Sequence, residues 1–121
     1  MQGANLHMFE IPMMGLSLLE RIEETIKSGG KVEGEPTDQF GLGSNKFLMI
    51  VLMGEAQQIG DALYDSKSKA KKAIRSELYK AHNELQYLVR NLSDLEALKK
   101  TQATFEDLEV KIRALRESGK Y

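Results

Sequence analysis

Apolar residues recur at helical spacing along most of the chain. The clearest series has intervals of four, three, four, three and four residues, so its members share one helix face. Such a regular apolar face requires a partner helix, supplied either by the same chain or by another subunit. A second, shorter series lies nearer the C-terminus. The two series are Ile74, Leu78, Ala81, Leu85, Leu88 and Leu92, and Phe105, Leu108, Ile112 and Leu115.

The first helix is expected near the N-terminus. Ser17 and Glu20 have the spacing of a capping box, in which two side chains satisfy free backbone amides of the first turn. Apolar residues follow at helical spacing, namely Leu19, Ile22 and Ile26. The two glycines after Ser28 can adopt the left-handed conformation that ends a helix. We therefore predict a helix over about Ser17–Ser28, preceded by an N-terminal segment at residues 1–16.

A second helix is expected after a long loop. Residues 31–43 mix Gly, Pro, Asp and Thr without an apolar period, which is typical of a loop. Ser44 and Asn45 then offer a helix cap. The run Phe47–Met53 could by itself be a strand, but helical spacing continues beyond it and no comparable strand exists to pair with. The predicted face of this helix comprises Phe47, Leu48, Val51, Leu52, Glu55, Ile59 and Leu63.

These segments predict an all-α fold, a single-domain bundle of about four helices over residues 1–121. Gly54 and Gly60 weaken the second helix and could mark close contact with another helix. Two boundaries stay open. The second and third helices are either separate or one continuous rod, and the last third is one helix beginning near Ser93 or two helices divided near Thr104.

Composition excludes several classes of site. The chain has no cysteine and two histidines, so a disulfide framework, a thiolate nucleophile and a cysteine-rich zinc site are excluded. Glu20, Glu23 and Glu24 lack a suitably spaced histidine and are interpreted as a solvated acidic face, and no metal or cofactor is expected. The run Phe47–Met53 is about a third of the roughly 20 residues that span a bilayer. Without the features of a signal peptide, we expect a cytoplasmic protein that does not contact membranes.

Charge is distributed unevenly along the chain, although the formal net charge is only −1. Residues 1–65 carry four basic and ten acidic side chains, residues 66–92 carry seven and two, and residues 93–121 carry six and six. The basic charge is therefore concentrated in the middle segment. A basic helix face can bind a phosphate backbone by releasing counterions, whereas tyrosine and histidine can stack or donate hydrogen bonds.

The predicted nucleic-acid contacts lie in this basic segment. Helical spacing places Arg75, Tyr79, His82, Gln86 and Arg90 near one stripe beside the apolar face. No base-reading motif accompanies them, so we expect binding to the backbone without sequence specificity. The alternative is a solvated face, or one that pairs with the acidic first half of the chain. The full set of candidates is Lys67, Lys69, Lys71, Lys72, Arg75, Tyr79, Lys80, His82 and Arg90.

An enzymatic hypothesis rests on Arg75 and His82. An arginine followed after four to six residues by histidine is similar to the signature of the helical HEPN ribonucleases, and six residues separate this pair. Histidine would act as acid or base while arginine stabilised phosphate charge. The similarity covers two residues and lacks the surrounding polar positions. We expect a protein without a catalytic site and keep the ribonuclease as an alternative.

The general plan from about Asn45 to Ser118 resembles the small subunit of multisubunit CRISPR effector complexes. The residues concerned are FLMIVLMGEAQQIGDAL followed by SKSKAKKAIRSELYKAHNELQYLVR. The resemblance implies a non-catalytic subunit that stacks along a ribonucleoprotein complex, with other subunits or copies of itself as partners. It also implies backbone contacts by Lys67, Lys71, Lys72, Arg75 and Arg90. A helical adaptor that binds only protein is the alternative.

Overall fold

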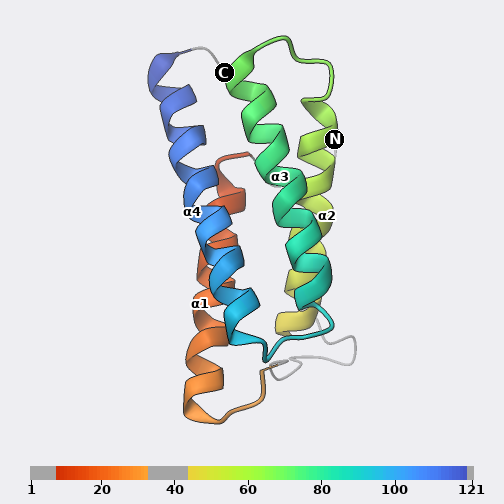
Figure 1. Cartoon of the computed structure of the whole chain (residues 1–121), viewed down its shortest axis with the longest axis vertical. Coiled ribbons are helices and arrows are strands. Elements are labelled where there is room, and N and C mark those ends of the chain that lie inside the picture. The colour runs from red at the N-terminus through yellow and green to blue at the C-terminus, as the bar shows by residue number, and fades with distance from the viewer. Residues whose placement is uncertain (1–7, 33–43, 120–121) are drawn as a thin grey trace.

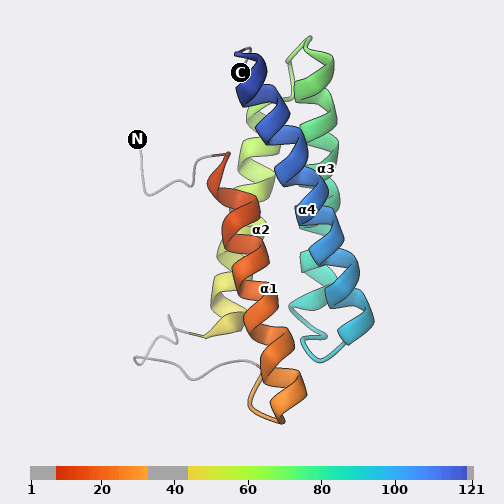
Figure 2. The same cartoon turned by 90° about the vertical axis from the view of Figure 1, so that its left-hand side faces the viewer.

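Four antiparallel α-helices make up the described part of the chain. The computed structural model describes residues 8–32 and 44–119. Its helices are α1 (Glu10–Ser28), α2 (Asn45–Ala62), α3 (Lys69–Leu88) and α4 (Leu95–Ser118). Each runs antiparallel to the next, which gives an up-down-up-down bundle (Figure 1 and Figure 2). The predicted all-α bundle of four helices is confirmed, and most of the loop expected at residues 31–43 lies outside the described residues.

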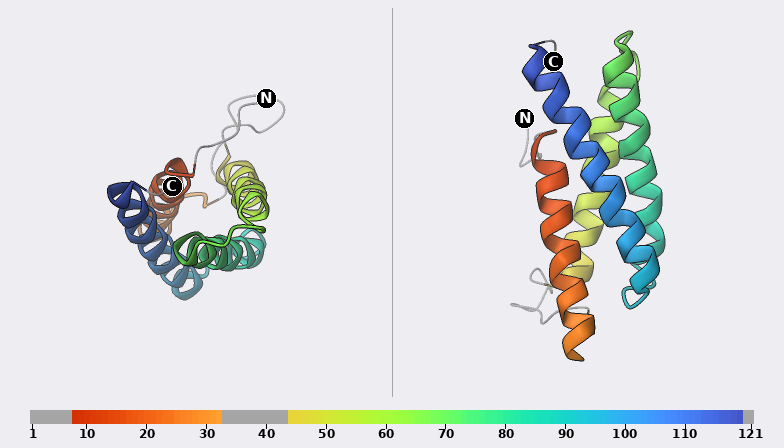
Figure 3. Two further views of the ribbon diagram at one scale, coloured as in Figure 1. Left: turned by 90° about the horizontal axis from the view of Figure 1, so that it is seen from above. Right: turned by 60° about the vertical axis from the view of Figure 1, so that its left-hand side comes forward.

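Helix α3 lies between α2 and α4, and α1 packs mainly on α4. The contact between α1 and α2 is the least extensive of the four (Figure 3). The α2–α3 turn lies at the same end of the bundle as the C-terminus of α4, whereas the α3–α4 turn lies at the opposite end (Figure 1). Within the described residues, no helix is long and apolar enough to cross a membrane.

The start of the first helix was predicted wrongly. Helix α1 begins at Glu10 and not near Ser17, so residues 10–16 belong to the helix. Pro12 lies in the first turn, where its missing amide proton removes no helical hydrogen bond. Ile11 is fully buried and Gly15 packs against α4, so tertiary contacts stabilise these first turns. The end was predicted correctly, because Gly29 has a left-handed φ of 79°.

The buried face of α2 also differs from the prediction. Ser44 caps the helix as expected, accepting a hydrogen bond from the backbone amide of Phe47. Val51, however, is 37% exposed, and Phe47, Leu48, Glu55, Ile59 and Leu63 are only half-buried. The residues of α2 that are buried are Asn45, Met49, Leu52, Ala56 and Gly60. Because the start of α2 is apolar nearly all round, its pattern could not identify the side that packs against α1 and α3.

The burial of the two apolar series is confirmed, although α3 ends at Leu88 and Leu92 lies in the turn that follows it. Every member is buried, the most exposed being Leu92 at 6%. The partner helices come from the same chain, since α3 packs against both α2 and α4. Helices α2 and α3 are separate, and Ser68 caps α3 by accepting from the amide of Lys71. Helix α4 is continuous through Thr104, and its cap is Asp94, which accepts from the amide of Ala97.

Two glycines allow close packing between helices. A Cβ at Gly15 would lie 2.7 Å from the ring of Phe105, and a Cβ at Gly60 would lie 2.7 Å from the ring of Tyr79. These distances are well inside van der Waals contact, so each aromatic ring occupies space that only glycine leaves open. Gly60 therefore fulfils the predicted role at a helix contact. Gly54 does not, because a Cβ there would meet no atom within 4 Å.

Candidate nucleic-acid interface

The exposed lysines of α3 form one face of the bundle. Lys69, Lys72 and Lys80 are exposed, and they lie on one side of the helix with three other exposed residues at intervals of three or four. No member of this set is acidic. At a rise of about 1.5 Å per residue, the face is about 27 Å long. We call it the α3 ridge, and its members are Lys69, Lys72, Ser76, Lys80, Asn83 and Tyr87.

Lysines are most concentrated where α3 begins. The lysine cluster consists of Lys67, Lys69, Lys71 and Lys72, of which only Lys71 is half-buried. The first turn of α3 contains no acidic residue. The partial positive charge of the helix N-terminus repels these ammonium groups, each at a cost of about 0.3–1 kcal/mol. The cluster is therefore unfavourable for α3 itself, although Ser68 caps the helix.

The α3 lysines form no ion pair with the described residues of the acidic first half of the chain. Among the described residues, neither Lys80 nor any lysine of the cluster takes part in an ion pair. Glu23 of α1 instead binds Lys99 of α4 at 2.7 Å and Lys27 of α1 at 2.9 Å. Within residues 8–32 and 44–65, no acidic side chain of the first half of the chain forms an ion pair with these lysines.

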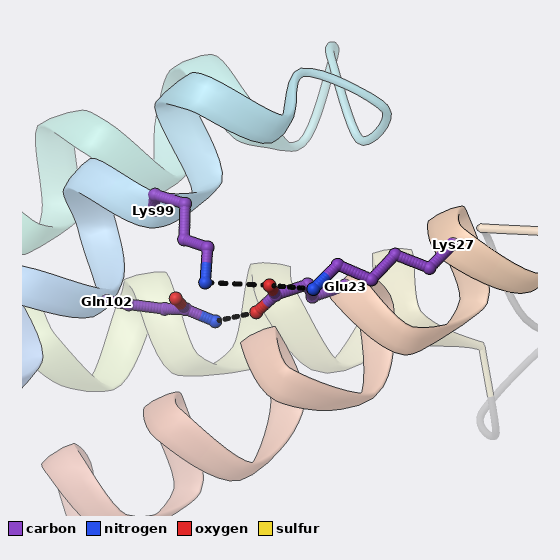
Figure 4. Close-up of polar contacts among 4 residues, drawn as sticks. All are labelled: Glu23, Lys27, Lys99 and Gln102. Carbon is purple, nitrogen blue, oxygen red and sulfur yellow. Dashed lines mark hydrogen bonds and ion pairs between the residues drawn. The ribbon is translucent and has the colours of Figure 1, made fainter.

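Glu23 was wrongly interpreted as part of a solvated acidic face. Glu23 is only 8% exposed, and its carboxylate is held between α1 and α4 (Figure 4). Gln102 donates a hydrogen bond to Glu23 Oε1 at 3.0 Å. The hydrogen bond from Lys99, with those from Lys27 and Gln102, lowers the pKa of Glu23 to about 2. Glu23 is therefore an ionised group that joins two helices, and not a free surface charge.

Arg75 and Tyr79 turn from the α3 ridge toward α2. Arg75 Nη1 donates to the backbone oxygen of Tyr64 at 2.6 Å. The Tyr79 hydroxyl donates to Asp61 Oδ1 at 2.6 Å, and this hydrogen bond raises the pKa of Tyr79. Both side chains thus serve the contact between α3 and the end of α2.

His82 also faces α2. Its Nδ1 lies 3.1 Å from the backbone oxygen of Met53, and the residue is half-buried. Arg75 and His82 do share a side of α3, as their spacing predicts, but each bonds a different backbone carbonyl of the α2 region. These hydrogen bonds use one nitrogen of each side chain, and they leave His82 Nε2 and the other N–H groups of Arg75 available to a phosphate.

Arg90 lies far from the lysine cluster. It follows the last turn of α3, at the end of the bundle opposite the α2–α3 turn (Figure 1). The twenty residues of α3 separate the two ends by about 30 Å. Arg90 lines an open hollow of about 380 Å³ together with Lys46 of α2. The nine predicted contact residues therefore fall into three places: the lysine end and ridge of α3, the α2–α3 contact, and the α3–α4 turn.

Tyr64 was not among the predicted contacts. It lies in the turn after α2, is 66% exposed, and has the Arg75 guanidinium 5.3 Å from its ring centroid. The signal available in the sequence was an aromatic residue in a polar turn just before the lysine cluster. Helical spacing from α3 could not include it, because it lies outside that helix.

The described surface has other hollows but no recognisable metal site. The hollow between α3 and α4 has a volume of about 450 Å³ and is lined by Glu84, Asp94, Glu96 and Lys100 among others. No group of three or more His, Cys, Asp or Glu side chains in residues 8–32 and 44–119 is placed to hold a metal ion. Comparison of the chain with protein-family models, curated proteins and solved structures found no match.

Proposed function

We propose that this protein is a non-catalytic binding and assembly subunit that contacts a nucleic-acid phosphate backbone with the lysine cluster and α3 ridge. The observation that supports the proposal most directly is the group of lysines at the start of α3 that form no ion pair with any residue that the structure describes. These cations cost helix stability and balance no internal charge. A polyanion would offset the repulsion between them and gain affinity from counterion release.

The residues proposed to bind phosphate directly are fewer than the nine predicted from the sequence. Lys67, Lys69, Lys72 and Lys80 would provide most of the phosphate contacts, with Lys71 beside them. Arg75, Tyr79 and His82 would support the surface from the α2 side, since they bond to α2 and its following turn. Arg90 would be a separate contact, reached only by a strand that follows the length of α3.

The biological setting that we propose is a multisubunit ribonucleoprotein complex of the CRISPR effector type. The resemblance to the small subunits of such complexes and the bundle with one basic face support this setting. In such a complex the protein would hold a guide, target or displaced strand through its backbone, with neighbouring subunits supplying sequence specificity.

Binding to labelled single strands and duplexes at two salt concentrations tests the proposal. The test variant is Lys69→Glu/Lys72→Glu, which places carboxylates in the first turn of α3, where the helix favours them. The variant should remain folded by circular dichroism. We expect affinity to fall at least about tenfold. The plot of log affinity against log salt should also become less steep, the magnitude of its slope falling by about 2.

The matched control is Lys46→Glu/Lys100→Glu. Both residues are exposed lysines away from the lysine cluster, and the two variants change the net charge equally. On a strand too short to extend from the lysine cluster to the hollow that Lys46 shares with Arg90, the control should bind like the wild type at moderate salt. Equal weakening of both variants would mean that only net charge matters, and absence of salt-sensitive binding by the wild type would refute the proposal.

A second candidate function, binding of protein alone, rests on the outer face of α2. This face carries Ile50 at 47% exposure and Val51 at 37%, followed by the open surface at Gly54. The face between Phe47 and Gln58 has no charged residue at its centre. A two-fold contact places the same surface of both subunits together, so an uncharged face suits association with a second copy.

A further inference from the structure

Tyr64 is an aromatic side chain that the fold holds at the surface. It is 66% exposed, although burying such a ring would be favourable. Its position is fixed by the turn: its amide donates to the oxygen of Asp61 at 3.1 Å, and the amide of Ser66 donates to the oxygen of Leu63 at 3.1 Å. Leu63 packs against the core. The turn is therefore anchored on both sides of a ring that remains in solvent.

Arg75 supports this ring from α3. Its guanidinium lies 5.3 Å from the ring centroid and is held there by the hydrogen bond from Nη1 to the Tyr64 backbone oxygen. With the guanidinium over one face, the large exposed fraction leaves the other face of the ring open to a planar group. Arginine and tyrosine are among the side chains on which unpaired nucleic-acid bases stack.

The lysine cluster begins directly after Tyr64. Lys67 is three residues further along the chain, so the two Cα atoms are at most about 11 Å apart. The turn also contains Asp65, and Asp61 lies nearby, bound to Tyr79. The five cations from Lys67 to Arg75 outnumber these two carboxylates. An aromatic face and phosphate-binding cations thus occur together at one end of the bundle.

We infer that Tyr64 is a stacking platform for one unpaired base, and that it makes the lysine cluster prefer single-stranded over duplex nucleic acid. In a duplex the bases stack on one another and are not presented to a surface ring. A single strand can place a base on Tyr64 while its phosphates lie on the lysines. This inference rests on the proposed phosphate-binding function, and it adds that the nucleic acid bound is single-stranded.

The test compares Tyr64→Ala with Val110→Ala. Val110 is an apolar residue of α4 that is 57% exposed and lies outside the lysine cluster and the α3 ridge, so it serves as the control. The probes are labelled oligothymidine and oligouridine of roughly 15 nucleotides, and a duplex of the same length. Tyr64 is exposed and outside the helices, so its replacement should leave the fold intact, which circular dichroism checks.

We expect Tyr64→Ala to weaken single-strand binding about tenfold, the loss typical of one stacked base. Duplex binding and the salt slope should stay as in the wild type, because the phosphate contacts remain. Tyr64→Phe should keep affinity within about twofold, since it retains the ring. The chain has no tryptophan, so quenching of tyrosine fluorescence by oligothymidine gives an independent readout, which Tyr64→Ala should reduce.

Two outcomes overturn the inference while leaving the proposed function intact. The first is salt-sensitive binding in which Tyr64→Ala has the wild-type affinity for single strands. The second is an equal loss for single strand and duplex, or an equal loss with Val110→Ala. Absence of any salt-sensitive binding by the wild type instead refutes the proposed function, and the stacking role with it.

Discussion

At the scale of single residues, Glu23 is the side chain whose environment differs most from what its neighbours in the sequence indicate. Glu20, Glu23 and Glu24 resemble one solvated acidic face, yet only Glu23 points to α4 and becomes buried among Lys99, Lys27 and Gln102 (Figure 4). Its hydrogen bonds favour the charged form, and this preference makes the stability of the fold depend on pH.

Glu23→Gln should reveal that dependence. The pKa of Glu23 is about 2 in the folded protein and has an ordinary value of 4.5. A lowered carboxyl pKa means that the ion cluster stabilises the fold fully above about pH 5, and that this stabilisation is lost as pH falls from about 4.5 to about 2. Thermal unfolding should therefore show a lower melting temperature for Glu23→Gln at pH 7 and a difference that vanishes near pH 2.

Glu20→Gln is the control for this experiment, because Glu20 is an exposed glutamate on the same helix. Its melting temperature should follow the wild type across the pH range. A gap between Glu23→Gln and the wild type that stayed constant down to pH 2 would contradict the role given to the ionised carboxylate.

At the scale of the helices, glycines distinguish packed faces from open ones. Gly15 of α1 faces the ring of Phe105, which is fully buried among close-packed side chains. Gly54 of α2 faces open space. The same substitution should therefore have opposite effects at the two positions, although both lie within helices and have similar intrinsic propensity.

Urea unfolding of Gly15→Ala and Gly54→Ala checks this expectation. Gly54→Ala should raise the free energy of unfolding by about 0.5–1 kcal/mol, because alanine loses less backbone entropy in a helix. Gly15→Ala should lower it by about 1–2 kcal/mol, since overpacking against Phe105 outweighs the same gain in propensity. Stabilisation by both substitutions would show that α1 and α4 can separate at little cost.

At the scale of the whole molecule, the bundle has two different outer surfaces. The α3 ridge and lysine cluster are basic, whereas the outer face of α2 is apolar and uncharged at its centre. A subunit that binds a strand with one surface and a protein with another would need this division. The two proposed functions can therefore be tested separately on one molecule.

Light scattering over a range of concentrations tests association through α2. The wild type should exceed its monomer mass of 13.6 kDa as concentration rises. Ile50→Glu should stay monomeric, because a two-fold contact would bring two buried carboxylates together. Val110→Glu makes the same change at a valine of α4 that is 57% exposed, and should behave like the wild type. A wild type that remains monomeric throughout would refute association with a second copy.

The sequence by itself determined the elements that local physics controls. The regular apolar faces of α3 and α4 and the glycine that ends α1 follow from spacing and backbone freedom, and the structure has them as predicted. The concentration of lysines in residues 66–92 was also evident, because charge can be counted without a fold. These features depend on near neighbours in the chain.

Only the tertiary structure decided which residues share a surface. The start of α1 at Glu10 depends on packing of Ile11 and Gly15, and the buried face of α2 depends on the positions of α1 and α3. Arg75, Tyr79 and His82 were grouped with the lysines by spacing, yet they bond to α2 and its following turn. Helical periodicity gives the angle of a side chain around its own axis, whereas its partners are set by helices distant in the chain.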